Sequence, residues 1–319
     1  MNLTFKKSIR LNNSVAPVDN PLIKSLKKNY LLYIMLIPGL TFFLTFRYLP
    51  MLGLSISFMD YQPYLGVSGS EWVGLKHFQR FFSDPIFFKL FRNTLWLALL
   101  NLVFYFPIPI ILSLLLNEVR NRVFKRSVQS CIYLPHFLSW VVVVSLTQML
   151  FDSNSGIVNI IKESMGLEAF NPMLSTEWFR FTVLMQIVWK EAGWGTIIFL
   201  AALSGVNQSL YEAAYIDGAN RWKQTWHITL PSIRGTIITM FILRLGQFMN
   251  LGFAQMLLMV NAITRDLGEI FDTYVYELGI RGGQFSYTTA IGLFKSGISL
   301  VLVIIANKWA KKIGEDGIY

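Results

Sequence analysis

The chain has 319 residues, of which 54% are hydrophobic and only 14% charged, and its mean hydropathy is +0.48. Because a soluble domain carries about a quarter charged residues, this composition excludes an ordinary soluble protein and indicates an integral membrane protein. The single cysteine, Cys131, excludes an intramolecular disulfide and a multi-cysteine metal site. The formal net charge of +10 indicates either nucleic-acid binding or the membrane topology of the chain, and the placement of the charges decides between them.

In chain order, six apolar segments are long enough to cross about 30 Å of hydrocarbon, which takes roughly 20 helical residues. They are 31–50, 93–117, 130–151, 179–203, 235–260 and 286–308. The first is too long for the core of a signal peptide and precedes no clear cleavage site, so we expect a retained helix. The fold class is therefore an all-α membrane protein with about six transmembrane helices, and Pro107 and Pro109 predict a kink or a local opening in the second.

Two further regions complete the expected organisation. Residues 1–29 form a basic cytoplasmic tail ahead of a transmembrane domain at 30–319. The loop at about 59–91 should face outward, and it contains Trp72, Phe78, Phe81 and Phe82. This loop is either part of a docking surface for a partner or a helical cap over the bundle, and we favour the cap.

Lys and Arg gather in alternate connecting regions of the chain. They are frequent in the tail, after the second segment, in the central loop at about 204–234 and at the C-terminus, whereas the other three loops hold most of the acids. By the positive-inside rule, both termini and the central loop are cytoplasmic. The positive charge is therefore mainly a topology signal, and we expect lipid, not nucleic acid, around this chain.

The central loop carries clear helix boundaries. Ser209 precedes Glu212 by three residues, which is the capping-box spacing, and Gly218 suits the left-handed position that ends a helix. We therefore expect a short helix from Leu210 to Asp217. The loop between the fourth and fifth spans is then an exposed element that suits docking of another protein.

A second short helix follows, with Asn220 as its N-cap and with Trp222 and Trp226 on one face at i, i+4. Pro231 fits the first turn of the next membrane helix. A simpler reading stays open, in which Glu212 only caps a helix and the two tryptophans only anchor the loop at the membrane interface.

The stretch that begins with Glu212-Ala213-Ala214, continues to Gly218 after three residues and ends at Leu230-Pro231 resembles the EAA loop of permease subunits of binding-protein-dependent ABC importers. Other stretches are similar to one subgroup, the carbohydrate uptake (maltose-type) permeases of the poly- and oligosaccharide branch. These stretches are Tyr133–Trp140, Leu116–Asn121 and Ala290–Phe294.

The resemblance implies a multi-pass subunit of the bacterial plasma membrane that pairs with a second homologous permease. It also implies two cytoplasmic ATPase subunits and an extracytoplasmic solute-binding protein as partners. The positions that would couple to the ATPase are Glu212, Ala213, Ala214, Asp217 and Gly218. Since the chain has no G-x-x-x-x-G-K-[ST] loop, ATP and Mg are expected on the partner ATPase, and this chain is expected to bind no cofactor and to be no enzyme.

Four charged residues fall near the middle of the membrane: Lys190, Glu191, Arg244 and Lys295. Each costs about 2.5–3.5 kcal/mol on insertion scales, so such side chains usually face protein or a water-filled path. Pairing of Glu191 with Arg244 or Lys295 is the structural alternative, and it leaves two cations unpaired. Of the isolated histidines, we expect His136 at a cytoplasmic helix end and His227 on a helix face of the central loop.

Polar and aromatic residues lie near these charges in the expected spans. Gln186, Gln247 and Asn250 offer hydrogen bonds, while Trp189 and Trp194 offer flat faces for sugar rings or are ordinary packing residues. The favoured function is import of oligo- or polysaccharides, with anionic, uronate-containing cargo as a hypothesis. The alternative is a secondary transporter or channel for a polar solute, although Glu191 would be its only coupling carboxylate. A membrane enzyme would need a nucleophile–base pair or a metal cluster, and the spans contain neither.

Overall fold

The computed structural model describes residues 28–250, 252–315, 317 and 318. They belong to two compact units, one that ends at Ser55 and one that begins at Ile56. Most of the predicted tail, residues 1–27, lies outside the described residues. In the smaller unit, α2 (Tyr30–Phe43) continues into a π-helical turn, η1 (Leu44–Tyr48), and neither element has a buried residue. A helix that is apolar on every side suits a lipid or partner-chain environment.

The larger unit opens with a small hairpin in which β1 (Met59–Asp60) pairs antiparallel with β2 (Glu71–Trp72). The short helix α3 (Gly66–Gly69) lies between these strands and α4 (Lys76–Ser83) follows them. Asp60 binds Lys76 Nζ at 2.5 Å, and this hydrogen bond holds the pKa of the Asp60 carboxyl below its usual range.

The rest of the larger unit is helical. In chain order its elements are α5 (Ile86–Leu100), η3 (Asn101–Tyr105), α6 (Pro107–Glu118), α7 (Arg122–Tyr133), η4 (Leu134–Phe137), α8 (Trp140–Phe151), α9 (Ile157–Ser164), α10 (Phe179–Ser204), α11 (Gln208–Ile216), α12 (Arg221–Gln224), η5 (Thr225–Thr229), α13 (Leu230–Ser232), α14 (Arg234–Gly246), α15 (Phe253–Met259), α16 (Arg265–Gly268), α17 (Phe271–Val275), η6 (Tyr276–Arg281) and α18 (Phe285–Lys312). The turn η2 (Leu49–Phe58) joins this unit to the smaller one.

Among the described residues, four helices are long and apolar enough to span a membrane, and two bent helix pairs bring the number to as many as six. The four are Tyr30–Phe58, Ile86–Glu118, Phe179–Ser204 and Phe285–Lys312. The predicted helical class is confirmed, whereas two predicted segments, 130–151 and 235–260, are not the continuous helices that we expected.

The segment 130–151 is bent by 103° between Arg122–Phe137 and Trp140–Phe151. Pro135 occupies the first turn of η4 and cannot donate a helical hydrogen bond. Ser139 then adopts an extended conformation and its side chain accepts a hydrogen bond from Val142 N at 3.3 Å, which starts a new helix.

The segment 235–260 is broken after Gly246, where α14 ends. The chain turns through Gln247 and resumes as α15 after Gly252, whose φ of +81° favours glycine. Apolar composition continues across this break, and for that reason the sequence predicted one long span.

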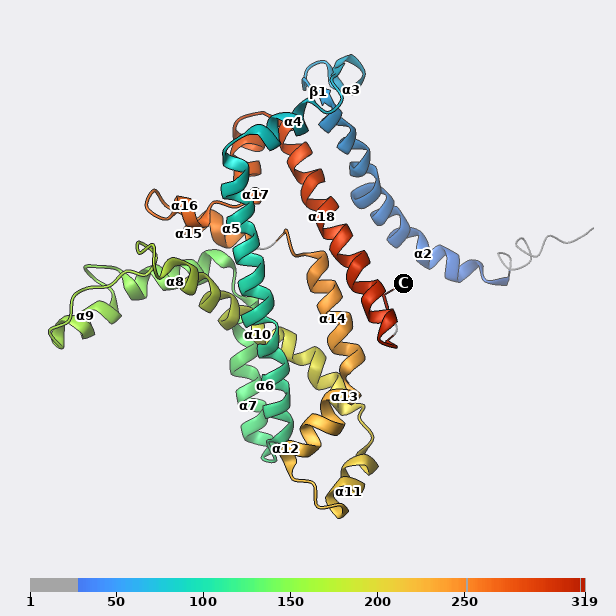
Figure 1. Ribbon diagram of the computed structural model, residues 1–319, viewed down its shortest axis with the longest axis vertical. Helices are drawn as coiled ribbons and strands as arrows, with labels where there is room; N and C mark the ends of the chain where they lie inside the picture. The colour runs from blue at the N-terminus through green and yellow to red at the C-terminus, as the bar shows by residue number, and fades with distance from the viewer. Residues whose placement is uncertain (1–27, 251, 316, 319) are drawn as a thin grey trace, which may run out of the picture. The chain divides into compact units, whose positions relative to one another are not determined.

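The second span opens locally, as its prolines predicted. Pro107 has no N–H, and the preceding turn, η3, is π-helical, with Phe106 N donating to Asn101 O at 3.1 Å. Helices α6 and α10 lie side by side, and α14 packs along α18 (Figure 1). Close approach to α10 requires glycine, because a Cβ at Gly195 would lie 2.8 Å from Cγ of Pro109.

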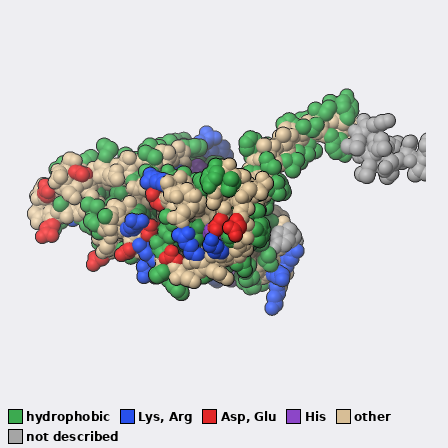
Figure 2. Space-filling view, turned by 90° about the horizontal axis from the view of Figure 1, so that it is seen from above, with side chains coloured by type: hydrophobic (Ala, Val, Ile, Leu, Met, Phe, Trp, Pro, Cys, Tyr) green, Lys and Arg blue, Asp and Glu red, His purple; other side chains and the backbone are tan. Residues whose placement is uncertain are grey.

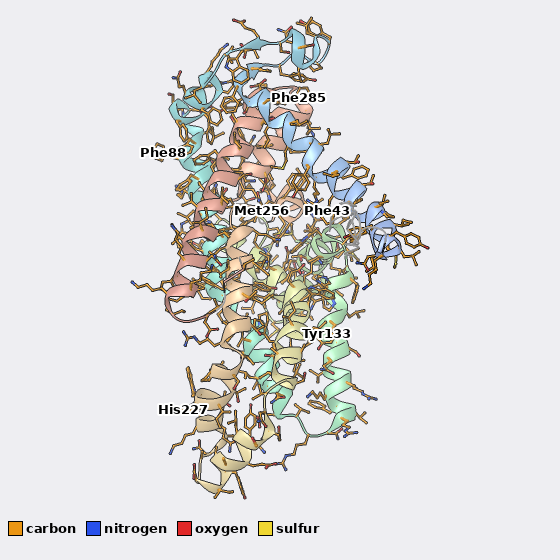
Figure 3. The ribbon with its side chains drawn as sticks, turned by 90° about the vertical axis from the view of Figure 1, so that its right-hand side faces the viewer. Phe43, Phe88, Tyr133, His227, Met256 and Phe285 are labelled. Atoms are coloured by element: carbon orange, nitrogen blue, oxygen red, sulfur yellow. The ribbon has the colours of Figure 1, made fainter. Side chains whose placement is uncertain are left out.

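The loop at 59–91 caps the helices of its own unit. Phe81 of α4 is fully buried, with its ring 5.8 Å from that of Phe271 and 5.5 Å from that of Phe294. This agrees with the cap that we favoured. Seen from this end, acidic and basic side chains are interspersed among hydrophobic ones (Figure 2). Phe285 at the start of α18 lies near this end, and His227 lies at the opposite end, in the central loop (Figure 3).

Candidate functional site

An open hollow of about 290 Å³ lies between η3–α6, α10 and α14, and we call it the path hollow. Trp194, Arg244 and Gln247 all line it, together with Tyr105. The structure thus brings together three of the residues predicted for a substrate path. A guanidinium, an amide and an aromatic ring are the groups that bind a charged sugar through ion pairing, hydrogen bonding and stacking.

Trp194 is held in place by a neighbour that the sequence did not connect with it. Its indole stacks on the His136 ring, with ring centroids 4.5 Å apart and planes within 8°. His136 Nδ1 lies 3.0 Å from Glu191 Oε2, and Lys190 Nζ donates to the His136 carbonyl at 2.8 Å. His136 lies at a helix end, as we expected, in the last turn before the bend, and its side chain packs against α10.

Among its described residues, the structure does not contain the alternative pairing, a salt bridge of Glu191 with Arg244 or Lys295. Glu191 instead lies 3.2 Å from Lys190 Nζ, its neighbour along α10, and it bonds His136. Lys295, only 4% exposed, pairs with Asp272 of α17, which lies between the fifth and sixth predicted spans. Since Asp272 compensates one cation, the predicted surplus of two positive charges falls to one, on Arg244.

Arg244 binds neutral groups and forms no salt bridge among the described residues, although the charge of Glu191 lies near enough to attract it. Its Nε donates to Asn101 Oδ1 at 2.9 Å, and its guanidinium carbon lies 4.7 Å from the centre of the Tyr105 ring. Asn101 is 2% exposed and sits in the π-helical turn η3. Sequence reasoning missed Asn101 and Tyr105, although two polar side chains inside an apolar span were a visible signal.

The remaining predicted path residues do not line the path hollow. Gln186 is buried, and its side-chain amide is already hydrogen-bonded within the protein. Its Nε2 donates to Thr147 Oγ1 at 2.7 Å, and its Oε1 accepts from Gln255 Nε2 at 2.8 Å. Trp189 is half exposed on α10, and Asn250 lies exposed in the turn after α14. Within the described residues, no three His, Cys, Asp or Glu side chains converge to hold a metal ion.

The central loop forms a two-helix elbow, as predicted, with one change of cap. Asn207, not Ser209, caps α11, and its side chain accepts from Ser209 N at 3.0 Å. Gly218 has φ +72° and ends the helix, while Asn220 caps α12 by accepting from Lys223 N at 2.9 Å. The predicted tryptophan pair of α12 and η5 is also confirmed, with ring centroids 6.1 Å apart.

The coupling residues predicted for this loop are accessible. Glu212, Ala213, Asp217 and Gly218 are exposed and Ala214 is half-buried. Large apolar side chains beside them are also exposed, Tyr215 by 78% and Ile216 by 84%. Exposed apolar side chains of this kind suit contact with another protein or with the membrane.

A helical unit with apolar spans, a hollow between them that contains an arginine and a glutamine, and an exposed pair of short helices at one end define the chain as a membrane transport subunit. Residues 106–314 match the family described as binding-protein-dependent transport system inner membrane component, and the chain belongs to this family. It is accordingly a multi-pass protein of the bacterial inner membrane, a permease of an ABC sugar importer and not an enzyme.

Two curated relatives come from Bacillus subtilis strain 168. The polygalacturonan/rhamnogalacturonan transport system permease protein YteP is 53% identical over 298 residues, which cover 93% of this chain and 92% of YteP. Protein LplB is also 53% identical, over 92% of this chain and 93% of LplB. Among solved structures, a bacterial alginate ABC transporter in complex with an alginate pentasaccharide-bound periplasmic protein has a chain with 37% identity. Its TM-score is 0.85, and the match covers 94% of this chain and all of that one.

Proposed function

We propose that this chain is the permease subunit of an ATP-driven importer of acidic, uronate-containing oligosaccharides. The observation that carries the proposal is Arg244, a cation without a carboxylate partner among the described residues, beside Trp194 and Gln247 in the path hollow. A half-buried guanidinium of this kind favours a passing carboxylate, whereas a neutral sugar would gain only hydrogen bonds and stacking. The names of YteP and of the alginate transporter, both concerned with acidic polysaccharides, support the same cargo class.

In the proposed assembly, a second homologous permease and two cytoplasmic ATPases complete the membrane complex, and an extracytoplasmic solute-binding protein delivers the sugar. Both termini and the central loop face the cytoplasm, and ATP and Mg bind the ATPases. The exposed face of α11 around Glu212 would dock on the ATPase. Its apolar neighbours, Tyr215 and Ile216, support this role.

The experiment is uptake by the importer reconstituted with its ATPases and solute-binding protein. Arg244→Gln should raise the KM for trigalacturonate about tenfold and change uptake of the fully methyl-esterified trimer less than twofold, because only the free acid carries carboxylates. The matched control, Arg234→Gln at the start of the same helix, should leave both unchanged. Equal losses for both sugars would refute the acidic cargo, and uptake without ATP would instead support a secondary transporter.

A further inference from the structure

A second hollow, of about 300 Å³, lies at the end of the larger unit opposite the central loop, and we call it the outer hollow. It lies between the hairpin, α4 and the first turn of α18. Its lining includes Arg80, Gln284, Tyr61 and Phe285. We propose that the outer hollow is a binding subsite for a uronate residue of the oligosaccharide before it reaches the path hollow. This inference rests on the proposed function and on the orientation given there.

The first argument is the charge of the outer hollow. Apart from Arg80 and two tyrosines, the titratable groups that line it are Asp60 and His77, and Asp60 is paired with Lys76. Asp60 lies 2.5 Å from Lys76 Nζ and 3.1 Å from His77 Nε2. Arg80 has no carboxylate partner among the described residues, and its guanidinium lies over the Tyr287 ring at 4.2 Å. Arg80 is therefore the charge that an incoming ligand would meet, and it suits an anion.

The second argument is the backbone around Arg80. The helix α18 begins at Phe285 and runs for 28 residues. Of its first-turn N–H groups, those of Phe285 and Thr288 donate to the carbonyls of Gly283 and Gln284 at 3.0 and 3.1 Å. Those of Ser286 and Tyr287 have no acceptor within the helix and carry partial positive charge, which favours a carboxylate. A guanidinium beside a helix N-terminus offers several donors to one carboxylate, and Arg presents two of them in a planar fork.

The third argument is the neutral part of the lining, which suits the rest of a sugar. Gln284 Oε1 is buried and accepts no hydrogen bond within the described part of the chain, so it would gain a donor if a sugar hydroxyl reached it. The rings of Tyr61 and Phe285 lie edge to face, 6.3 Å apart, and supply aromatic surface. The outer hollow thus repeats the chemistry of the path hollow, with a guanidinium, an amide and an aromatic ring in each.

The test is the KM for trigalacturonate in the reconstituted importer. Arg80→Gln should raise KM about tenfold and change kcat less than twofold. Arg80→Lys, which keeps the charge but loses the planar fork, should recover part of the loss. Arg281→Gln is the matched control, because Arg281 is an exposed arginine of the preceding turn that pairs with Glu277 and does not line the hollow.

A second measurement tests whether Arg80 binds a carboxylate of the sugar or a carboxylate of the solute-binding protein. The affinity of the sugar-free solute-binding protein for the importer should be the same for the wild type and Arg80→Gln. An unchanged KM in Arg80→Gln, or a weakened affinity for the sugar-free binding protein, would overturn the subsite. Failure of the wild-type importer to take up trigalacturonate would instead refute the acidic cargo, so the two failures are distinguishable.

Discussion

At the scale of single residues, Lys190 shows how the chain tolerates a charge at membrane depth. It is 6% exposed, and its ammonium group has two oxygen partners, the His136 carbonyl and Glu191 Oε1. It also lies 5.6 Å from the centre of the Trp140 ring. The cation is thus compensated within its own neighbourhood and is not available to cargo, in contrast to Arg244.

We therefore predict that Glu191→Gln lowers the free energy of unfolding by about 2 kcal/mol. The value is below the range for breaking a fully buried ion pair because Glu191 is partly exposed and Lys190 keeps the His136 carbonyl. Lys190→Met with Glu191→Gln should recover at least half of the loss, since no unpaired cation remains. Thermal denaturation of the purified complex measures this, and additive effects of the two changes would contradict the pairing.

The residue types of the path were predictable, but their partners were not. An arginine, an amide and a tryptophan at membrane depth are visible in the sequence as Arg244, Gln247 and Trp194. Whether a cation is paired depends on which helices meet, and Lys295 meets Asp272 only because α17 folds back onto α18. A single sequence does not contain that contact, so the count of uncompensated charges had to come from the structure.

At the scale of elements, the composition predicted which segments are apolar but not where they break. Helix α10 matches its predicted span within one residue, because no proline or capping signal interrupts it. The breaks at Ser139 and after Gly246 occur where apolar composition continues. They depend on local caps and on the packing of neighbouring helices, and mean hydropathy along the chain is sensitive to neither.

The packing of α10 against the bent pair gives a prediction at Gly193. A Cβ there would overlap the backbone carbonyl of Ile132, which has no room to move because its amide belongs to helix α7. We expect Gly193→Ala to cost about 3 kcal/mol, at the upper end for overpacking. The control is Gly205→Ala at the end of the same helix, where the nearest atom is the Ala202 carbonyl at 3.5 Å.

The measurement is the yield and thermal stability of the permease complex extracted from membranes. Gly205→Ala should match the wild type, whereas Gly193→Ala should give less complex with a lower Tm. A Gly193→Ala complex of wild-type stability would show that α7 and α10 are farther apart than described.

At the scale of the whole molecule, the proposed docking of α11 on a separate ATPase subunit predicts a specific defect for Glu212→Lys. Among the described residues Glu212 has no ion-pair partner, so its charge is free to meet a basic residue of the ATPase. Reversal of the charge should lower co-purification of the ATPase at least tenfold and abolish uptake. Glu163→Lys, an equal reversal at an exposed site of α9, should change neither. Survival of both ATPase association and transport in Glu212→Lys would end the docking role.

The orientation of the chain predicts opposite reactivity for its two ends. Tyr64, near the hairpin, and Val123, at the start of α7, are 81% and 75% exposed, so cysteines there should react equally well with a small maleimide in detergent. The chain's one cysteine, Cys131, is also exposed and must first be replaced by Cys131→Ser. By the positive-inside rule, Tyr64→Cys faces outward, whereas Val123→Cys lies among the cytoplasmic arginines and lysines.

In intact spheroplasts, a membrane-impermeant maleimide should therefore label Tyr64→Cys and should label Val123→Cys only after the membrane is permeabilised. The reaction in detergent controls for intrinsic reactivity. The reverse labelling pattern would place the central loop outside the cell, away from any ATPase. It would refute both the coupling role of the central loop and the outward position of the outer hollow, because both depend on this one orientation.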